Sequence, residues 1–279
     1  MRESSLPRAS PSRCRPSRRK RGWTLATSLL SATSTIRVGH LVIDNNLRHP
    51  VLLGKMATTL DVISGGRLDL GIGSGSYELE HLEGGFPWGT LAERTARLAE
   101  SLEILTSMFA NERTSFEGQH YQVRDVPNLP RPVQQPRPPI HVGGVGVRFT
   151  VPLVARYADV WNIPTYGLGR WEEVAPSVDA ACEAIARDPA SLRRSLEAVL
   201  VLAPDDPSLE SARAVAERRY GGPGWGLDAG GFVGTPAAIV DRVGSFLEKG
   251  ISQFVFFVSD RGEPETLALL AEEVIAKFR

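Results

Sequence analysis

The sequence has little of what marks several protein classes. It contains two cysteines, Cys14 and Cys182, among 279 residues, too few for a disulfide framework or a zinc cluster by themselves. No stretch approaches the roughly 18–20 apolar residues that a membrane-spanning helix needs. The five histidines lack metal-ligand spacing, and the pattern H-E-x-x-H does not occur. We therefore expect no integral membrane protein and no metal site.

The sequence also lacks the nucleophile of a hydrolase. Gly73-Ser74-Gly75 does not have the spacing of the G-x-S-x-G elbow, and no catalytic triad can be named. A chain with neither a nucleophile nor a metal set is expected to leave its chemistry to a bound cofactor.

Charge is distributed unevenly along the chain, although the net charge is zero. Residues 1–22 hold eight of the 32 Lys and Arg and one acidic residue, so this segment carries +7 and the remainder −7. An acidic body argues against a nucleic-acid-binding core, which needs a basic surface. Residues 1–22 are rich in Ser, Pro and Arg, and a segment so poor in apolar residues is expected to be disordered. Three interpretations remain open for it: a targeting segment, a basic arm for anionic partners, or non-native sequence from a misplaced start.

From Trp23 onward, strand-like and helix-like patterns alternate. Several of the strands are apolar on both faces, which is typical of a parallel sheet covered by helices. This order fits either a doubly wound sheet or a (β/α)8 barrel. The six predicted strands are 36–43, 67–72, 140–142, 159–163, 196–202 and 254–258.

Two of these strands end in glycine-rich segments. The first contains Gly71, Gly73 and Gly75, which lack the G-x-G-x-x-G spacing of a dinucleotide site. The second runs from Gly143 to Gly146 and is expected to open a helix, where backbone N–H groups and the helix dipole favour a phosphate. Two such strand ends indicate a phosphorylated ligand.

The segments 36–50 and 53–75 resemble the bacterial luciferase-like monooxygenase family, most closely the branch that uses the deazaflavin coenzyme F420. Further similar blocks follow in family order at 130–136, 140–144, 155–162 and 234–236. The resemblance extends from Trp23 to the C-terminus.

The resemblance implies an α/β fold, a (β/α)8 TIM barrel that is N-terminally truncated, with six of eight strands recognisable. Family members have a strand, a helix and a second strand before the helix that matches Trp23–Ser34. The domain expectation is thus a disordered basic tail at 1–22 and a luciferase-like barrel domain at 23–279. Unpaired strand edges at 36–43 and 254–258 make a homo-oligomer possible.

The resemblance also implies where a cofactor binds. Val42, Ile43 and Asn45 fall on the segment that lines the ring, where the family often has a cis peptide. The resemblance implies three further cofactor-binding segments: a second cofactor loop, a phosphate-binding loop and a strand end near the pocket. The residues they contribute are Gly73, Ser74, Gly75 and Tyr77, then Gly143, Gly144, Val145 and Gly146, and last Trp161 and Asn162. No catalytic residue is implied. Ile43-Asp44 and Ser76 depart from the family pattern, which has Thr-Gly and a large aromatic residue there.

The function implied is an oxidoreductase that uses coenzyme F420 for hydride transfer on an unknown small organic substrate, in the cytoplasm, without nucleic-acid or membrane partners. One alternative is an FMN-dependent monooxygenase that inserts oxygen through a flavin peroxide. Another is an inactive truncated relic that only binds a phosphorylated ligand or a partner chain.

Overall fold

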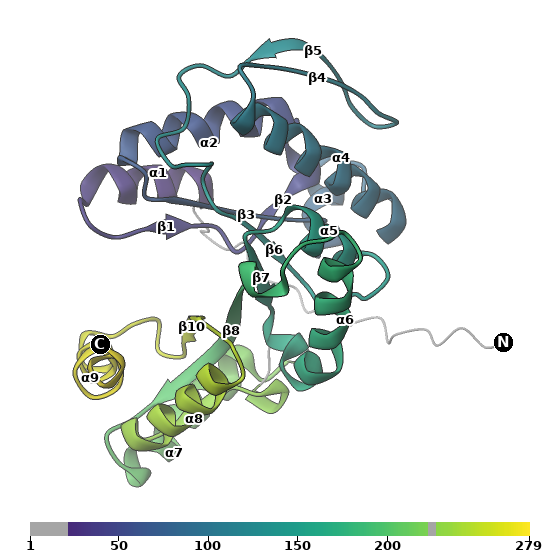
Figure 1. Cartoon of the computed structure of the whole chain (residues 1–279). Coiled ribbons are helices and arrows are strands. Elements are labelled where there is room, and N and C mark those ends of the chain that lie inside the picture. Colours follow the sequence, from purple (N-terminus) through teal and green to yellow (C-terminus); the bar gives the residue numbers. More distant parts are fainter. Residues whose placement is uncertain (1–21, 223–226) are drawn as a thin grey trace, which may run out of the picture.

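The structure is a computed structural model that describes residues 22–222 and 227–279. Its centre is a curled parallel sheet with helices packed on it (Figure 1). The expected tail at 1–22 lies outside the described residues except for Gly22, which begins the first helix. The strands of the curled sheet are β1 (Val38–Gly39), β2 (Ile43–Asp44), β3 (Leu68–Gly73), β6 (Ile140–Gly143), β7 (Val160–Ile163), β8 (Arg193–Leu202), β9 (Phe232–Gly234) and β10 (Gln253–Val258).

Helices follow most of these strands. Their boundaries carry standard signals: α2 has Pro50 in its first turn and ends at Gly65 with φ +64°, and Thr90 and Glu93 form a capping box on α4. The α-helices are α1 (Gly22–Ala32), α2 (Pro50–Ser64), α3 (Glu78–Gly84), α4 (Leu91–Ala110), α5 (Thr150–Tyr157), α6 (Trp171–Glu183), α7 (Asp206–Tyr220), α8 (Pro236–Glu248) and α9 (Pro264–Leu269). The short helical turns are η1 (Asn45–Leu47), η2 (Thr165–Arg170), η3 (Pro189–Ser191), η4 (Leu227–Ala229), η5 (Leu270–Val274, a π-helix) and η6 (Ile275–Phe278).

The sheet has two chemically different faces because successive side chains of a strand point in opposite directions. Its order is β1-β3-β6-β7-β8-β10, with β2 paired to β3 and β9 to β8, all parallel. The outer face is apolar and shares one core with α1, α2, α4, α5, α6 and α8. It consists of Leu68, Leu70, Ile72, Ile140, Val142, Trp161, Ile163, Leu196, Ala198 and Leu200.

The opposite, inner face is largely polar. The register places His141, Val160 and Arg193 in one row across it, and Asn162, Ser195 and Gln253 in the next. Helix α7 also lies on this face, where Ala216 packs with Val199 and Val201 of β8. A (β/α)8 barrel places its helices in an outer ring, so α7 departs from that pattern.

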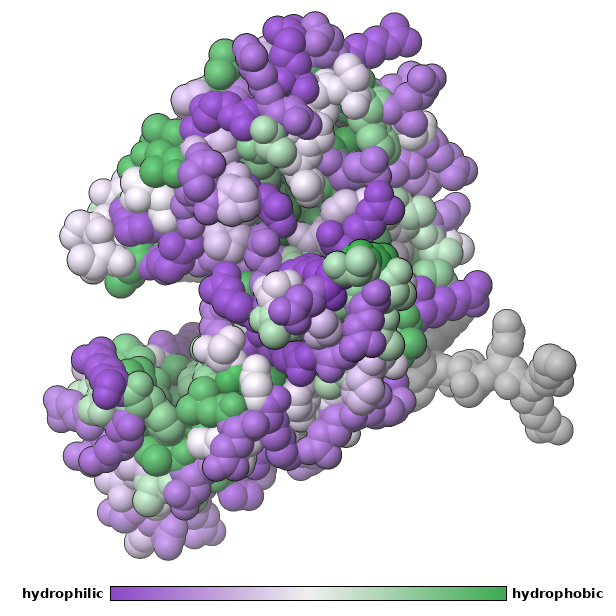
Figure 2. All heavy atoms as spheres, viewed as in Figure 1, coloured by the Kyte–Doolittle hydropathy of each residue, from purple (hydrophilic) through white to green (hydrophobic). Residues whose placement is uncertain are grey.

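The sheet stays open between its two end strands. Within the described residues β1 and β10 pair on one side only, and no ladder joins them. Figure 2 shows a deep notch between the part of the molecule that carries α1 and β1 and the part that carries β10 and α9, as located in Figure 1.

Several sequence expectations need correction. The strand expected at 36–43 is two short strands, β1 and β2, with a cis peptide between Leu41 and Val42, where the resemblance implied one. The sequence analysis missed α3, the three-residue β9 and an antiparallel hairpin of β4 (Arg113–Glu117) and β5 (Gln122–Pro127). The hairpin was missed because it is mostly exposed and polar, which leaves little apolar periodicity to detect.

Candidate functional site

The predicted cofactor residues gather at one edge of the sheet. Strands β2, β3, β6 and β7 are neighbours and parallel, so their carboxyl ends meet there. Asp44 pairs with Gly73, Ile72 with Val142, and Gly143 with Asn162. The two glycine-rich segments, 70 residues apart in the chain, therefore lie side by side. We call this place the strand-end edge; it consists of residues 42–46, 73–77, 143–146 and 161–162.

Glycine is required in the first of these loops because the chain packs closely on itself. A Cβ atom on Gly73 would lie 2.6 Å from Cγ2 of Val42, and one on Gly75 would lie 2.5 Å from Oδ2 of Asp44. Gly75 also has φ +85°, which disfavours any other residue. At these two positions the missing side chain makes room for the preceding strand end.

The carbonyl oxygen of Ser74 is held from two sides. Nδ2 of Asn46 donates to it at 2.9 Å and Nε of Arg94 at 3.2 Å. Arg94 is buried, and its guanidinium lies 3.6 Å from the ring centre of Trp88. Burial lowers the pKa of Arg94 from its ordinary value. The Ser74–Gly75 turn is consequently fixed by residues of η1 and α4.

The half-buried Asp44 and the fully buried His81 form a pair behind this turn. Nε2 of His81 lies 2.6 Å from Oδ2 of Asp44, and its Nδ1 lies 3.2 Å from the carbonyl oxygen of Pro87. A carbonyl oxygen only accepts, so Nδ1 of His81 is the donor to Pro87. Sequence analysis missed this pair because the two residues are 37 positions apart and no local pattern joins them.

The second glycine-rich loop differs from its expected form. The prediction that Gly143–Gly146 opens a helix directly is wrong, because a turn at 147–149 comes before α5. The first N–H groups of α5, from Thr150 and Val151, bond to the carbonyl of Gly146 at 2.8 and 3.1 Å. They are therefore not available to a ligand.

The Gly144 peptide is held by β7. Its N–H donates to the Asn162 carbonyl at 3.0 Å, and its carbonyl accepts from Nε1 of Trp161 at 2.8 Å. Gly144 has φ +128°, and a Cβ there would lie 3.1 Å from Cγ2 of Thr150. In the described part of the chain, the N–H groups of Val145 and Gly146 have no acceptor. These two are the donors this loop can offer to an anion.

The other predicted residues fall into different environments. Trp161 is fully buried and packs with Trp171 on the outer face, so its ring supports the loop from behind. Ile43 is buried as well, whereas Val42 and Tyr77 are exposed. Asn45 is 1% exposed, and neither atom of its side-chain amide has a partner among the described residues. An unpaired buried amide is costly, which makes Asn45 a position where a bound polar group would be stabilising.

Asn162 faces the inner side of the sheet, where sequence analysis missed an acidic neighbour. Its Oδ1 accepts from Oγ of Ser195 at 2.8 Å, and its side chain also bonds to Glu197 of β8. Burial raises the pKa of Glu197 to about 7, against the opposing effect of the Asn162 bond. A single acidic residue within the apolar run 196–202 was the signal that could have identified it.

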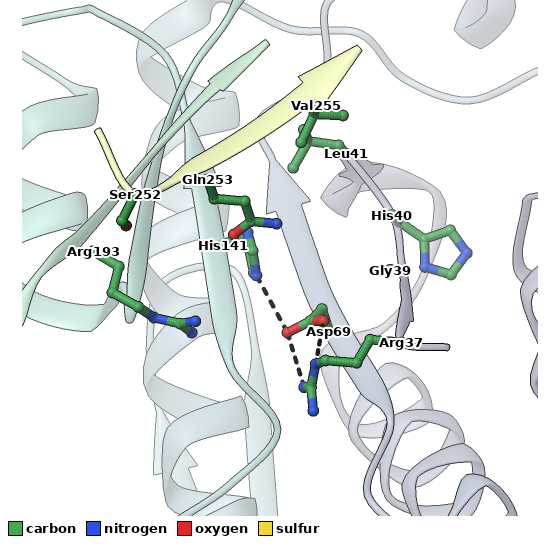
Figure 3. A pocket seen from close by; sticks show the side chains of 10 residues that line it. All are labelled: Arg37, Gly39, His40, Leu41, Asp69, His141, Arg193, Ser252, Gln253 and Val255. Atoms are coloured by element: carbon green, nitrogen blue, oxygen red, sulfur yellow. Dashed lines mark hydrogen bonds and ion pairs between the residues drawn. The ribbon is translucent and has the colours of Figure 1, made fainter. Parts of the chain in front are cut away.

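A second group of polar residues lies at the amino ends of the strands. A cavity of about 460 Å³ in the open side of the sheet is lined by residues of β1, β3, β6, β8 and β10 (Figure 3). In it, Nε and a terminal nitrogen of Arg37 bond to Asp69 at 3.0 and 3.1 Å, and Nε2 of His141 lies 3.4 Å from the same carboxylate. Burial would raise the pKa of Asp69, but the bonds from His141 and Arg37 outweigh it and hold that pKa low. None of the predicted site residues lines this cavity.

The described residues lack two further features. No three His, Cys, Asp or Glu side chains there come together to hold a metal ion. No helix in residues 22–222 and 227–279 is long and apolar enough to cross a membrane.

Comparison with known proteins finds a matching family model and several similar proteins. The family model described as luciferase-like monooxygenase matches residues 12–229. The F420-dependent glucose-6-phosphate dehydrogenase of Amycolatopsis mediterranei is 28% identical over 201 residues, 68% of this chain and 58% of that protein. The FMNH(2)-dependent dimethylsulfone monooxygenase of Pseudomonas putida is 31% identical over 121 residues, 43% of this chain and 33% of that protein. The chain thus matches little more than half the length of the first of these relatives.

Solved structures share the fold. Monooxygenase RslO1 from Streptomyces bottropensis superposes with a TM-score of 0.80 at 20% identity, covering 93% of this chain and 83% of that one. The coenzyme F420 dependent tetrahydromethanopterin reductase from Methanopyrus kandleri gives 0.73 at 18% identity, covering 92% and 88%. At these identities the likeness concerns the fold alone.

Proposed function

The chain belongs to the luciferase-like monooxygenase family, and we propose that it is an oxidoreductase that binds coenzyme F420 at the strand-end edge for hydride transfer on a small organic substrate. The observation that carries the proposal is the meeting of four neighbouring strand ends, with two glycine-rich loops side by side. Similarity to F420-dependent glucose-6-phosphate dehydrogenases supports the choice of cofactor.

Three features of the strand-end edge fit such a cofactor. The unbonded N–H groups of Val145 and Gly146 suit a phosphate, because backbone donors in a glycine-rich turn form an anion-binding concavity. The unpaired amide of Asn45 suits a polar atom of the ring. When bound, the deazaflavin supplies the carbon that accepts or gives the hydride.

The protein's own residues hold the two loops that position that group. Asn46 and Arg94 hold the Ser74 carbonyl, and Trp161 holds that of Gly144, so both loops are fixed before a ligand arrives. Preformed loops lose little conformational entropy on binding, which increases affinity.

The test is a fluorescence titration of the purified chain with F420 and, separately, with FMN. The proposal expects saturable binding of F420, loss of affinity in Asn45→Leu, and unchanged affinity in the exposed control Glu183→Gln. Equal, unsaturable signals with both compounds would overturn it.

An FMN-dependent monooxygenase is the second candidate, favoured by the similarity to the dimethylsulfone monooxygenase. It predicts tighter binding of FMN than of F420, and oxygen uptake when reduced FMN and a substrate are present. Binding of either cofactor without turnover would instead support a ligand-binding role, which the open side of the sheet favours.

A further inference from the structure

The carboxylate of Asp44 joins three segments at the strand-end edge. Its Oδ1 accepts from the backbone N–H of Asn46 at 2.8 Å and from Nδ2 of the same residue at 3.0 Å. Its Oδ2 lies 2.6 Å from Nε2 of His81, and a Cβ atom on Gly75 would lie 2.5 Å from that oxygen. One side chain therefore contacts η1, the first glycine-rich loop and α3, which lies next to β2 (Figure 1).

These contacts fix the turn that carries Asn45. Asp44 is the N-cap of η1, and its bond to the N–H of Asn46 closes the turn in which Asn45 is the first residue. The side chain of Asn45 is buried, and its amide has no partner in the described part of the chain. Without bonds of its own, this amide is oriented by its backbone and by packing. The direction in which Asn45 presents its amide to a ligand consequently depends on Asp44.

The same carboxylate reaches the Ser74 carbonyl through Asn46. Nδ2 of Asn46 bonds to Asp44 and also donates to the carbonyl oxygen of Ser74 at 2.9 Å. Nε of Arg94 donates to that oxygen from the other side at 3.2 Å. The position of the first glycine-rich loop is thus set by η1 and α4 together.

The contacts that start at Asp44 return to it through His81. The guanidinium of Arg94 lies 3.6 Å from the ring centre of Trp88, and that ring lies 4.8 Å from the ring of His81. His81 is fully buried, and its second ring nitrogen lies 3.2 Å from the carbonyl oxygen of Pro87. Because a connected network with buried members makes a structure rigid, displacement of one member should loosen the others.

We propose that Asp44 and His81 are positioning residues of the cofactor site, whose pair holds the Asn45 amide and the Ser74–Gly75 turn in the geometry that the cofactor binds. This rests on the proposed F420-dependent function. His81 acts through Asp44, because its ring is buried and both of its nitrogens face protein atoms. Helix α3 therefore contributes to affinity although it carries no residue of the strand-end edge.

The chain offers a matched control for the role of Asp44. Asp188 also caps a three-residue helical turn, η3, and accepts from the N–H of Ala190 at 2.9 Å. This turn directly precedes β8 and so lies toward the amino ends of the strands, away from the strand-end edge. Asp188→Ala removes the same kind of cap without a change at the proposed site.

The first experiment needs no cofactor. Hydrogen–deuterium exchange of the backbone amides is compared in the wild type, His81→Phe and Asp188→Ala. Phenylalanine keeps a ring against Trp88 and removes both ring nitrogens, so exchange should rise about fivefold or more in residues 42–47 and 73–77. Asp188→Ala should leave both segments unchanged. An increase confined to residues 78–89 would overturn the proposal.

The second experiment is the fluorescence titration with F420, at a temperature at which circular dichroism shows every variant folded. Asp44→Ala and His81→Phe should each weaken binding about tenfold or more, and Asp188→Ala less than about twofold. The double variant should lose no more than the weaker-binding single variant, because the two side chains act as one unit. Losses that multiply would show two independent effects and overturn the pair.

Asp44→Asn tests whether geometry or charge matters. Its Oδ1 can still cap η1 and its amide can donate to Nε2 of His81, so it should recover most of the affinity that Asp44→Ala loses. A variant that merely destabilised the fold would change the free energy of unfolding and not the affinity of the folded protein. An asparagine variant as weak as the alanine variant would overturn the positioning role.

The outcomes separate the two proposals. If the wild type binds F420 and Asp44→Ala binds it equally well, the pair has no positioning role while the proposed function stands. If the wild type binds FMN and not F420, the choice of cofactor is wrong, and the FMN affinities of the same variants decide for or against the pair. If the wild type binds neither compound, both proposals fail.

Discussion

The two faces of the same sheet contrast sharply in this protein. On the outer face, alternate residues of β3, β6, β7 and β8 are apolar and join one core with α1, α2, α4, α5, α6 and α8. On the inner face, the residues in between include Asp69, His141, Asn162, Ser195 and Glu197. Leu70 and Asp69 are neighbours in the chain, yet one is in the core and the other bonds to Arg37 and His141. The outer face supplies stability, and the inner face carries polar groups that cost stability unless they are paired.

The largest effect should follow from a change on the outer face. Leu70→Ala removes a fully buried side chain from the main core, and we expect a loss of about 2–5 kcal/mol in the free energy of unfolding. Ser195→Ala on the inner face, equally buried, removes one hydrogen bond and should cost about 1 kcal/mol. Urea unfolding of both variants measures the difference. Equal losses in the free energy of unfolding would show that the two faces do not differ in their contribution to stability.

Glu197→Gln tests the cost of a polar group on the inner face through the pH dependence of protein stability. The pKa of Glu197 is about 7 in the folded protein, against an ordinary value of 4.5 that the unfolded chain should show. Between pH 4.5 and 7, Glu197 is protonated in the folded protein and ionised in the unfolded chain. The free energy of unfolding of the wild type therefore falls as pH rises from about 4.5 to 7, and it stays low above pH 7. The loss is on the order of 3 kcal/mol.

The variant carries a neutral amide of similar shape and should lack this slope. Unfolding at pH 4.5 and at pH 8 measures it: the two proteins should be similar at the lower pH, and Glu197→Gln more stable at the higher. Parallel curves for the two proteins would show that Glu197 is ionised in the folded state.

A smaller effect is expected at the second glycine-rich loop. Gly144→Ala introduces a Cβ at φ +128° and 3.1 Å from Thr150, which should cost about 1–3 kcal/mol and displace the Val145 and Gly146 donors. Affinity for F420 should fall about tenfold. Gly169→Ala is the matched control, because nothing lies within 4 Å of a Cβ there. Fluorescence titration compares the two, and similar affinities would remove this loop from the binding site.

The smallest effect concerns Arg148, whose exposed guanidinium lies 5.1 Å from the Phe149 ring centre. If backbone groups carry the phosphate contact, Arg148→Ala should weaken F420 binding by about 0–1 kcal/mol and lower its salt dependence slightly. The same titration at low and high salt measures both. A loss larger than that of Gly144→Ala would show that side-chain charge carries the contact.

The glycine-rich segments of the strand-end edge could be recognised in the sequence. Glycines at the ends of apolar strands are visible locally, and parallel strands bring their carboxyl ends to one edge whatever their order. Thus Gly73 and Gly143 lie at the ends of neighbouring parallel strands. The sequence did not indicate that a turn at 147–149 separates the second glycine-rich loop from α5, because Val147-Arg148-Phe149 carries no strong turn signal.

What the sequence by itself determined is the alternation of strands and helices, most of their positions, and the two glycine-rich strand ends. These depend on interactions within one element or between neighbouring ones. Only the tertiary structure decided that His81 meets Asp44, that α7 lies on the inner face, and that Glu197 is buried beside Asn162. Each of these depends on segments that are 35 or so residues apart or on the register between strands. A one-residue shift in register would have turned Glu197 toward the core instead.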